Sequence, residues 1–269
     1  MVLFAGAARC LAIRDADEKC AAVQELAAAD TAGNPDLDTD APLAAPGLPG
    51  CPALPRLVDP ARVPRRRLGS AAGRAAFVHA IAHIEFNAIN LALDAVCRFR
   101  GMPRAYYSDW VSVAADEVRH FQLLAQRLRE LGSAYGNLPA HGGLWDMAER
   151  TADSCLARMA LVPRVLEARG LDVTPGMIAR LRQIGDEATV AALEIILAEE
   201  IRHVAIGSQW FRYCCEREGL EPTETFLYLL ETRYSGMVRG PFNLDARFTA
   251  GFTAGELVAL QASSHTGPN

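Results

Sequence analysis

The chain has 269 residues with a formal net charge of −5, and 51% of its residues are apolar. This length and composition suit a soluble globular protein with a full hydrophobic core, and the mild acidity gives no support to broad nucleic-acid binding. Seven scattered cysteines without a CxxC pair argue against a disulfide framework or a zinc ribbon. No run approaches about 18 apolar residues, and no basic stretch precedes the apolar start, so we expect a cytoplasmic protein without a membrane span or secretory signal.

The N-terminal part of the sequence changes character near residue 33. Residues 15–30 are rich in alanine and predict a short helix, whereas eight prolines fall between residues 33 and 64. Because proline fixes φ and removes a backbone donor, this density excludes helix and central strand and predicts an extended arm. The basic run Arg65 to Arg67 follows, and it is the only local feature that favours a nucleic-acid partner.

The rest of the sequence is helical almost to its end. A break at Gly170 and the pair Thr174-Pro175, a cap residue before a proline, indicate that one helix ends and another begins there. Four helices are long, so the predicted fold class is all-α: a four-helix bundle with an N-terminal extension and an additional C-terminal helix. Periodicity and turn signals place the helices at residues 71–99, 104–132, 145–169, 175–184, 187–218 and 223–236.

Three regions follow from these elements. Residues 1–68 are expected to form the N-terminal helix and the proline-rich arm. Residues 69–255 are expected to form the bundle, and residues 256–269 a C-terminal tail.

Two short stretches of the helical part nearly repeat each other, DEVRH and EEIRH. Each places a glutamate three residues before a histidine, and side chains at that spacing lie on the same face of a helix. In both helices the pair interrupts an otherwise apolar stripe, which is the face expected to be buried. The two pairs are Glu117 with His120, and Glu200 with His203.

The other two long helices each carry a single carboxylate in the corresponding stripe, Glu85 in the first and Glu167 in the third. The interval from Glu85 to Glu117 is 32 residues, and that from Glu167 to Glu200 is 33. Two helix pairs of matched length are therefore expected to bring all four glutamates to one level of the bundle.

Four buried carboxylates at one level require positive charge, because burying even one unpaired carboxylate costs several kcal/mol. No arginine or lysine lies on these faces, whereas two divalent metal ions would neutralise all four. Mixed oxygen and nitrogen ligands suit iron or manganese better than structural zinc, which prefers sulfur-rich sites. We therefore predict a dinuclear metal site, most simply two iron ions, with manganese or a mixed pair as alternatives. Its predicted ligands are Glu85, Glu117, His120, Glu167, Glu200 and His203.

Residues beside these ligands could support them. Asp116 and Glu199 are placed to accept a hydrogen bond from the far ring nitrogen of a ligand histidine on another helix; the alternative is a solvent-facing charge. Arg119 and Arg202 would pair with such acids or be exposed. Pro163, one turn before Glu167, is expected to kink the third helix.

A second polar stripe lies on the first long helix, on the side away from Glu85. His83 is two residues from Glu85 and therefore about 200° around the helix, so the two cannot reach one metal. We expect the stripe, which comprises His79, His83, Asn90 and Asp94, to contact the N-terminal arm or solvent.

These features resemble those of the ferritin-like superfamily of di-iron carboxylate proteins. Over roughly residues 60–255 the chain is most similar to a bacterial ferritin-like family of unassigned function. The stretches that carry this similarity are RRRLGSAAGRAAFVHAIAHIEFNAINLALDA, DEVRH, EEIRHVAIGSQWF and RGPFNLDARF. The tRNA-modifying di-iron hydroxylase and the bacterial monooxygenase hydroxylases are more distant. The resemblance implies a ferritin-like di-metal bundle and the six ligands named above, and it implies no substrate.

Three functions remain open. The first is an oxidoreductase that activates dioxygen at a di-iron centre to hydroxylate or oxidise an organic substrate, which could be linked to tRNA. The second is iron binding or peroxide scavenging, and the third is a binding protein whose metals only hold the bundle together. The chain has no flavin or iron–sulfur motif, so the first function would need a separate electron donor. The oligomeric state is left open, and no membrane partner is expected.

Overall fold

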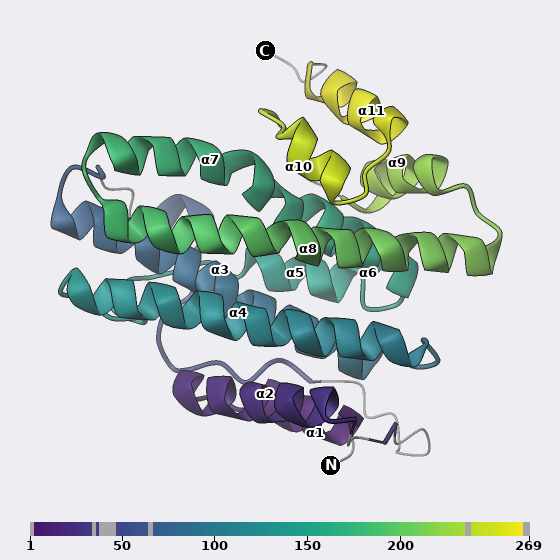
Figure 1. Ribbon diagram of the computed structural model, residues 1–269, viewed down its shortest axis with the longest axis horizontal. Coiled ribbons are helices and arrows are strands. Elements are labelled where there is room, and N and C mark those ends of the chain that lie inside the picture. Colours follow the sequence, from purple (N-terminus) through teal and green to yellow (C-terminus); the bar gives the residue numbers. More distant parts are fainter. Residues whose placement is uncertain (1–2, 34–35, 38–46, 64–66, 235–237, 266–269) are drawn as a thin grey trace. The chain divides into compact units, whose positions relative to one another are not determined.

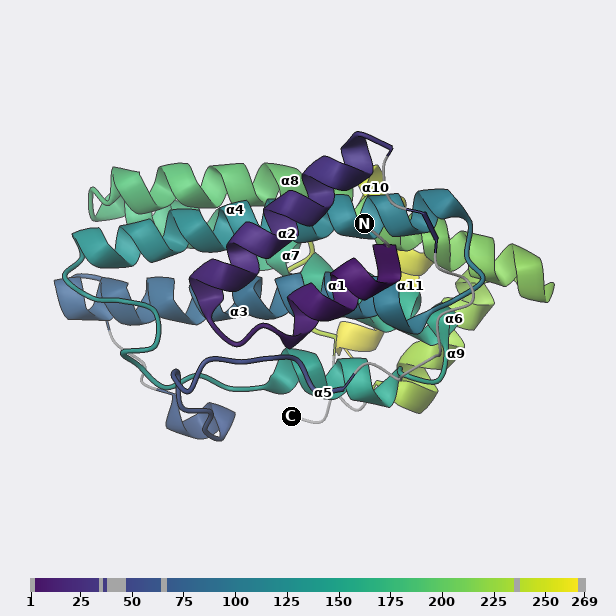
Figure 2. The ribbon, with the colours of Figure 1, turned by 90° about the horizontal axis from the view of Figure 1, so that it is seen from below.

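The structure is a computed structural model that describes residues 3–33, 36–37, 47–63, 67–234 and 238–265. Apart from one isolated bridge, the regular elements among these residues are all helices, so the predicted all-α class is confirmed. The chain divides into two compact units, residues 1–145 and residues 146–269. Figures 1 and 2 show the course of the helices within each unit.

The first unit is built on two long helices that pack against each other, α3 (Ala71–Arg98) and α4 (Arg104–Glu130). Two N-terminal helices cover them: α1 (Leu3–Ala12) packs against α3, and α2 (Ala16–Thr31) packs against α4 (Figure 2). The sequence predicted α2, α3 and α4 to within one or two residues. It did not predict α1 as a helix of its own.

The described part of the proline-rich arm is largely extended, as predicted. Its backbone pairs with residue Ala140 through the amide of Val58, 2.8 Å from the Ala140 oxygen, and through the Ala140 amide, 3.1 Å from the Arg56 oxygen. One short 3-10 turn, η1 (Pro60–Arg62), departs from the extended form, with proline at its first turn, where a missing N–H costs little. Arg65 and Arg66 of the basic run lie outside the described residues.

A fully buried lysine fastens the N-terminal helices to the arm and to α3. Lys19 donates hydrogen bonds to the backbone oxygens of Leu11 (3.0 Å) and Gly50 (2.9 Å) and to the side-chain oxygen of Asn90. Through this hydrogen bond Asn90, a member of the second polar stripe of α3, contacts helix α2 and not the arm itself.

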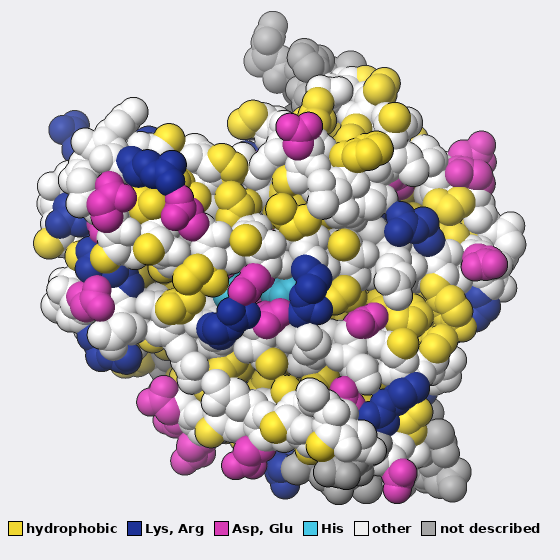
Figure 3. Space-filling model, in the orientation of Figure 1, with side chains coloured by type: hydrophobic (Ala, Val, Ile, Leu, Met, Phe, Trp, Pro, Cys, Tyr) yellow, Lys and Arg dark blue, Asp and Glu magenta, His cyan; other side chains and the backbone are white. Residues whose placement is uncertain are grey.

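Helix α3 is the one described helix that is long and apolar enough to cross a membrane, which the sequence analysis did not anticipate. Within its most apolar window, with a mean hydropathy of 1.3, 72% is buried inside the protein. Core helices of soluble proteins have the same character. On the molecular face drawn in Figure 3, acidic and basic side chains are interspersed, and no extended basic area is visible on that face.

The second unit is organised around its longest helix, α8 (Glu187–Glu218). Asp186 caps its start by accepting from the Thr189 amide, and Gly219 ends it in the left-handed conformation (φ 69°) that glycine adopts at little cost. Helices α6 (Cys155–Leu161) and α7 (Ala168–Gln183), with the π-helical segment η2 (Val162–Glu167) between them, pack along α8. The remaining helices are α5 (Gly143–Arg150), which spans the boundary at residue 145, α9 (Pro222–Arg233), α10 (Leu244–Thr249) and α11 (Ala254–His265).

Two sequence-based predictions in this unit are wrong. The helix predicted over residues 145–169 is interrupted at residues 151–154 and then continues as α6 and η2. The helix start predicted at Thr174-Pro175 is absent, since α7 runs without a break through Gly170 and Pro175. Packing of α7 against α8 buries residues along this helix and outweighs the local cost of glycine and proline in a helix interior, about 1 and 3 kcal/mol.

Two buried arginines connect α10 and α11 to the rest of the second unit. Arg247 of α10 forms a bidentate ion pair with Asp172 of α7, with distances of 2.9 and 2.7 Å. Arg164 of η2 pairs with Glu256 of α11 at 2.7 Å, and its guanidinium lies 4.3–4.7 Å from the ring centres of three phenylalanines, Phe211, Phe226 and Phe252. These contacts pack the RGPFNLDARF segment and the C-terminal helix onto α7 and η2.

Candidate metal centre

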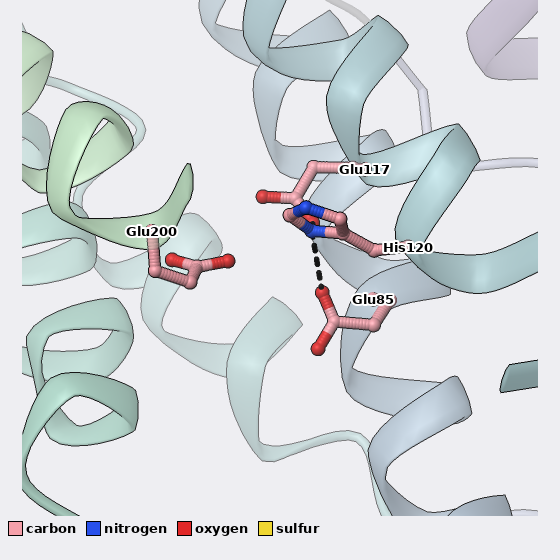
Figure 4. A group of neighbouring side chains, drawn as sticks. All are labelled: Glu85, Glu117, His120 and Glu200. Atoms are coloured by element: carbon pink, nitrogen blue, oxygen red, sulfur yellow. Dashed lines mark hydrogen bonds and ion pairs between the residues drawn. The ribbon is translucent and has the colours of Figure 1, made fainter. Parts of the chain in front are cut away.

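A cluster of two carboxylates and one imidazole lies in the core of the first unit. Glu85 comes from α3, and Glu117 and His120 come from neighbouring turns of α4. Their ligand atoms lie within 4.8 Å of one another, and the three residues are 5%, 0% and 0% exposed. The cluster is therefore withdrawn from water, and it is placed and composed so that it could hold a metal ion. Figure 4 draws these side chains together with Glu200, which belongs to the second unit.

The carboxylates of Glu117 and Glu85 favour the charged form of the His120 imidazole. Its Nδ1 atom lies 3.3 Å from Glu117 Oε2 and 3.4 Å from Glu85 Oε2, the latter drawn as the dashed line in Figure 4. Burial lowers the pKa of His120, but the hydrogen bonds and charges of Glu117 and Glu85 outweigh burial and raise it to about 11. A proton thus supplies one of the positive charges that this cluster requires.

The second unit carries a matching pair on α8. Glu200 Oε1 lies 3.5 Å from His203 Nδ1, and the residues are 8% and 0% exposed. Glu167 is half-buried at the C-terminal end of η2, the segment that packs on α8. Within the described part of the second unit, the ligand atoms of Glu167, Glu200 and His203 do not form a close group of three of their own.

The segment that ends at Glu167 is held against α8 by an unusually close contact. A β-carbon built on Gly207 would lie 2.3 Å from Cγ and 2.4 Å from Cβ of Pro163, distances that real side chains essentially never show. Glu200, His203 and Gly207 recur at steps of three and four, so one face of α8 carries the ligand pair and receives the proline. The π-helical turn replaces the simple kink predicted from Pro163, and such turns occur frequently at functional sites.

Of the predictions for the charged residues beside the ligands, one role of Arg119 is observed and the others remain predictions. Asp116 forms an exposed ion pair with Arg119 at 2.9 Å, which is one of the two roles predicted for that arginine. The hydrogen bonds that Asp116 and Glu199 are predicted to accept from ligand histidines stay predictions. In the second polar stripe of α3, His83 bonds Tyr135 and Asn87 instead of approaching Glu85.

The chain matches a family model described as "Protein of unknown function (DUF455)" over residues 12–258. It is also 47% identical over 213 residues to an uncharacterized protein of Haemophilus influenzae, an alignment that covers 77% of this chain and 74% of that protein. No solved structure matches the chain. The resemblance to a family of unassigned function is thus confirmed, whereas the ferritin-like relationship stays a prediction.

Proposed function

The chain belongs to the DUF455 family of proteins of unknown function, and we propose that it is a di-iron carboxylate protein that uses dioxygen to oxidise an organic substrate. The observation that carries the proposal is the buried group of Glu85, Glu117 and His120, whose ligand atoms lie within 4.8 Å of one another. Carboxylates and a histidine at such mutual distances in a buried position suit a metal cation.

The proposal joins this cluster to the second set of ligands. Each unit contributes one lone glutamate and one Glu-x-x-His pair, at intervals of 32 and 33 residues. In the proposed site four carboxylates and two imidazoles hold two metal ions, as in the di-iron bundles that the sequence resembles. Two divalent ions would balance the four carboxylate charges.

The donor set favours iron among the metals that proteins use. It contains oxygen and imidazole nitrogen and no thiolate, whereas structural zinc sites are typically closed and rich in cysteine. When bound, iron would supply the redox chemistry of dioxygen, which no side chain of this protein can perform. The chain's own contribution is to hold the ligands in place and to keep water away.

Apolar packing around the cluster of the first unit supports the proposal. Phe121 follows His120 directly and packs on Phe86 at 5.5 Å between ring centres, and both are nearly inaccessible. Ala82 lies one turn before Phe86 on the same helix and is fully buried. This dry, apolar surround strengthens electrostatic interactions between ligands and cations, because the local dielectric constant is low.

Metal analysis tests the proposal directly. Protein reconstituted with iron(II) under argon and freed of excess metal is expected to hold about two iron ions per chain. On mixing with air-saturated buffer it should consume dioxygen within seconds to minutes, and continued consumption should require added reductant and substrate. A reconstituted protein with one iron ion or none would refute the dinuclear assignment.

The same experiment separates the competing functions. Iron that stays inert toward dioxygen, combined with a bundle that melts on chelation, would replace the oxidase by a protein whose metals are structural. Rapid consumption of hydrogen peroxide without an organic substrate would favour the scavenging role.

A further inference from the structure

The first unit contains a second feature suited to a ligand, a cavity of about 650 Å³ between the arm and α3. Small-molecule sites commonly have volumes of about 300–1,000 Å³. One wall is the arm from Leu48 to Leu57, and the other is the α3 face that carries His83 and Asn87. Since His83 is about 200° around the helix from Glu85, the cavity lies on the side of α3 away from that ligand.

The arm is held in place independently of any ligand, so the cavity is preformed. Lys19 bonds the backbone oxygen of Gly50, and the Gly50 amide donates to Leu11 at 2.8 Å. A β-carbon on Gly50 would lie 2.2 Å from the Ala12 backbone oxygen, so only glycine permits this approach. Arg14 adds a hydrogen bond from Nε to the Cys51 oxygen at 3.3 Å.

The inner surface of the cavity presents a hydroxyl donor whose direction follows from its neighbours. The Asn87 amide nitrogen is 2.7 Å from the His83 backbone oxygen, which fixes the amide orientation, and 3.1 Å from His83 Nε2. Nε2 must then accept, so Nδ1 carries the ring proton and donates to Tyr135 Oη at 2.9 Å. The hydroxyl proton of Tyr135 is therefore left to donate to another group, and Tyr135 lines the cavity.

The charged side chains that line the cavity are all positive. Among the residues that line it, the charged ones are Arg14 and Arg56, and no carboxylate is present. Both side chains are exposed to solvent. The buried Lys19, beneath Gly50, adds a third positive charge to the same region. Apart from His83, Asn87 and Tyr135, the remaining lining is mainly apolar, including Phe86 and prolines of the arm.

We propose that this cavity is a binding site for a small organic anion, a carboxylate or phosphate on an apolar body. The Arg14 and Arg56 guanidinium groups hold the anionic group, the Tyr135 hydroxyl donates to it, and Phe86 with the arm prolines contacts the apolar body. Guanidinium groups recognise both carboxylates and phosphates through paired N–H donors. The site is separate from the metal ligands, and its occupation does not depend on the proposed oxidase activity.

A pair of fluorescent probes tests the proposal on the full-length protein. The anionic probe is 8-anilinonaphthalene-1-sulfonate, and N-phenyl-1-naphthylamine is the same molecule without its charge. We expect one anionic probe to bind per chain. The variant Arg14→Gln/Arg56→Gln should weaken its binding by roughly tenfold or more, which corresponds to about 0.7 kcal/mol for each arginine. The same variant should leave binding of the neutral probe nearly unchanged.

Two further variants complete the design. Tyr135→Phe removes only the hydroxyl and should weaken the anionic probe several-fold but not the neutral one. Arg9→Gln/Arg62→Gln makes the same charge change at two exposed arginines that do not line the cavity, and it should bind both probes like the unaltered protein. Competition with benzoate and with phenyl phosphate then shows which anionic group the site prefers.

The proposal is overturned by any of three results. The first is that the unaltered protein does not bind the anionic probe at a single saturable site. The second is that the Arg14/Arg56 variant binds it as tightly as the Arg9/Arg62 variant does. The third is that the arginine substitutions weaken binding of both probes equally, which would show an apolar cavity without selectivity for anions.

Discussion

The contact between Gly207 and Pro163 makes a quantitative prediction for the substitution Gly207→Ala. The added methyl group would lie 2.3 Å from Cγ of a proline ring that cannot rotate away, so η2 or α8 must move. Inserting a methyl group into a packed core costs about 1–3 kcal/mol. Alanine gains about 1 kcal/mol over glycine in a helix interior, which offsets part of this cost.

A Gly→Ala substitution at a second glycine serves as the control, because it gains the same helix propensity without the clash. Gly176 also lies inside a helix of the second unit, and a β-carbon there meets nothing within 4 Å. Gly176→Ala should therefore raise the free energy of unfolding by up to about 1 kcal/mol. The difference between the two variants isolates the overpacking cost of about 1–3 kcal/mol, or about 2–4 °C in Tm for each kcal/mol.

Urea unfolding followed by circular dichroism gives the free energies, and the iron content of the reconstituted variants gives the functional outcome. Because η2 ends at Glu167, a displaced segment should lower the iron content of Gly207→Ala and leave that of Gly176→Ala at about two. The double variant Gly207→Ala/Pro163→Ala should recover much of the lost stability, since the clashing ring is gone. Equal stability and equal iron content of the two single variants would refute the reasoning.

Three further predictions test separate features. Glu117→Ala should abolish metal binding at the paired site, whereas His83→Ala should leave the metal content unchanged. The opposite result would show that we have assigned the wrong face of α3 to the metal site. Arg247→Met should lower the free energy of unfolding by about 3–5 kcal/mol because it leaves Asp172 charged and buried, and Arg247→Met/Asp172→Leu should regain most of the loss in a urea titration. Burial lowers the pKa of Lys19 to about 8, so between pH 8 and 10.5 the unfolded state binds more protons than the folded state, and this group adds stability as the pH rises. The gain in the free energy of unfolding relative to Lys19→Met should reach about 3 kcal/mol over this range. Parallel pH profiles of the two proteins would contradict this.

The long helices were predictable because local signals and burial agree in them. Helix α8 begins after a capping aspartate and ends at a glycine, and its observed bounds, Glu187–Glu218, equal those predicted. In the third long helix the local signals were misleading. Gly170 and Thr174-Pro175 indicated a boundary, but packing against α8 keeps α7 helical through both.

The candidate ligands could be found from the sequence because charged side chains are unexpected on the buried face of a helix. A glutamate in an apolar stripe stands out, and the histidine three residues later shares its face, so Glu85, Glu117 and His120 were identified before their distances were known. The proposed anion-binding cavity has no comparable signal in the sequence. Arg14, Arg56 and Tyr135 are ordinary residues in the sequence, and only the fold of the arm over α3 brings them together.

The π-helical segment shows how a site can depend on residues that carry no chemistry. An α-helical period places Pro163 and Glu167 on one face, whereas the wider turn of η2 changes the direction of every side chain that follows it. The proline favours this turn because it has no N–H for an α-helical hydrogen bond, and Gly207 provides the space that lets the turn lie against α8. Glu167 is the last residue of the segment, and Gly207 lies one turn beyond His203 on the face of α8 that carries Glu200. The direction of the lone glutamate relative to the Glu-x-x-His pair of its own unit is therefore set by a proline and a glycine, residues that a search for ligands passes over.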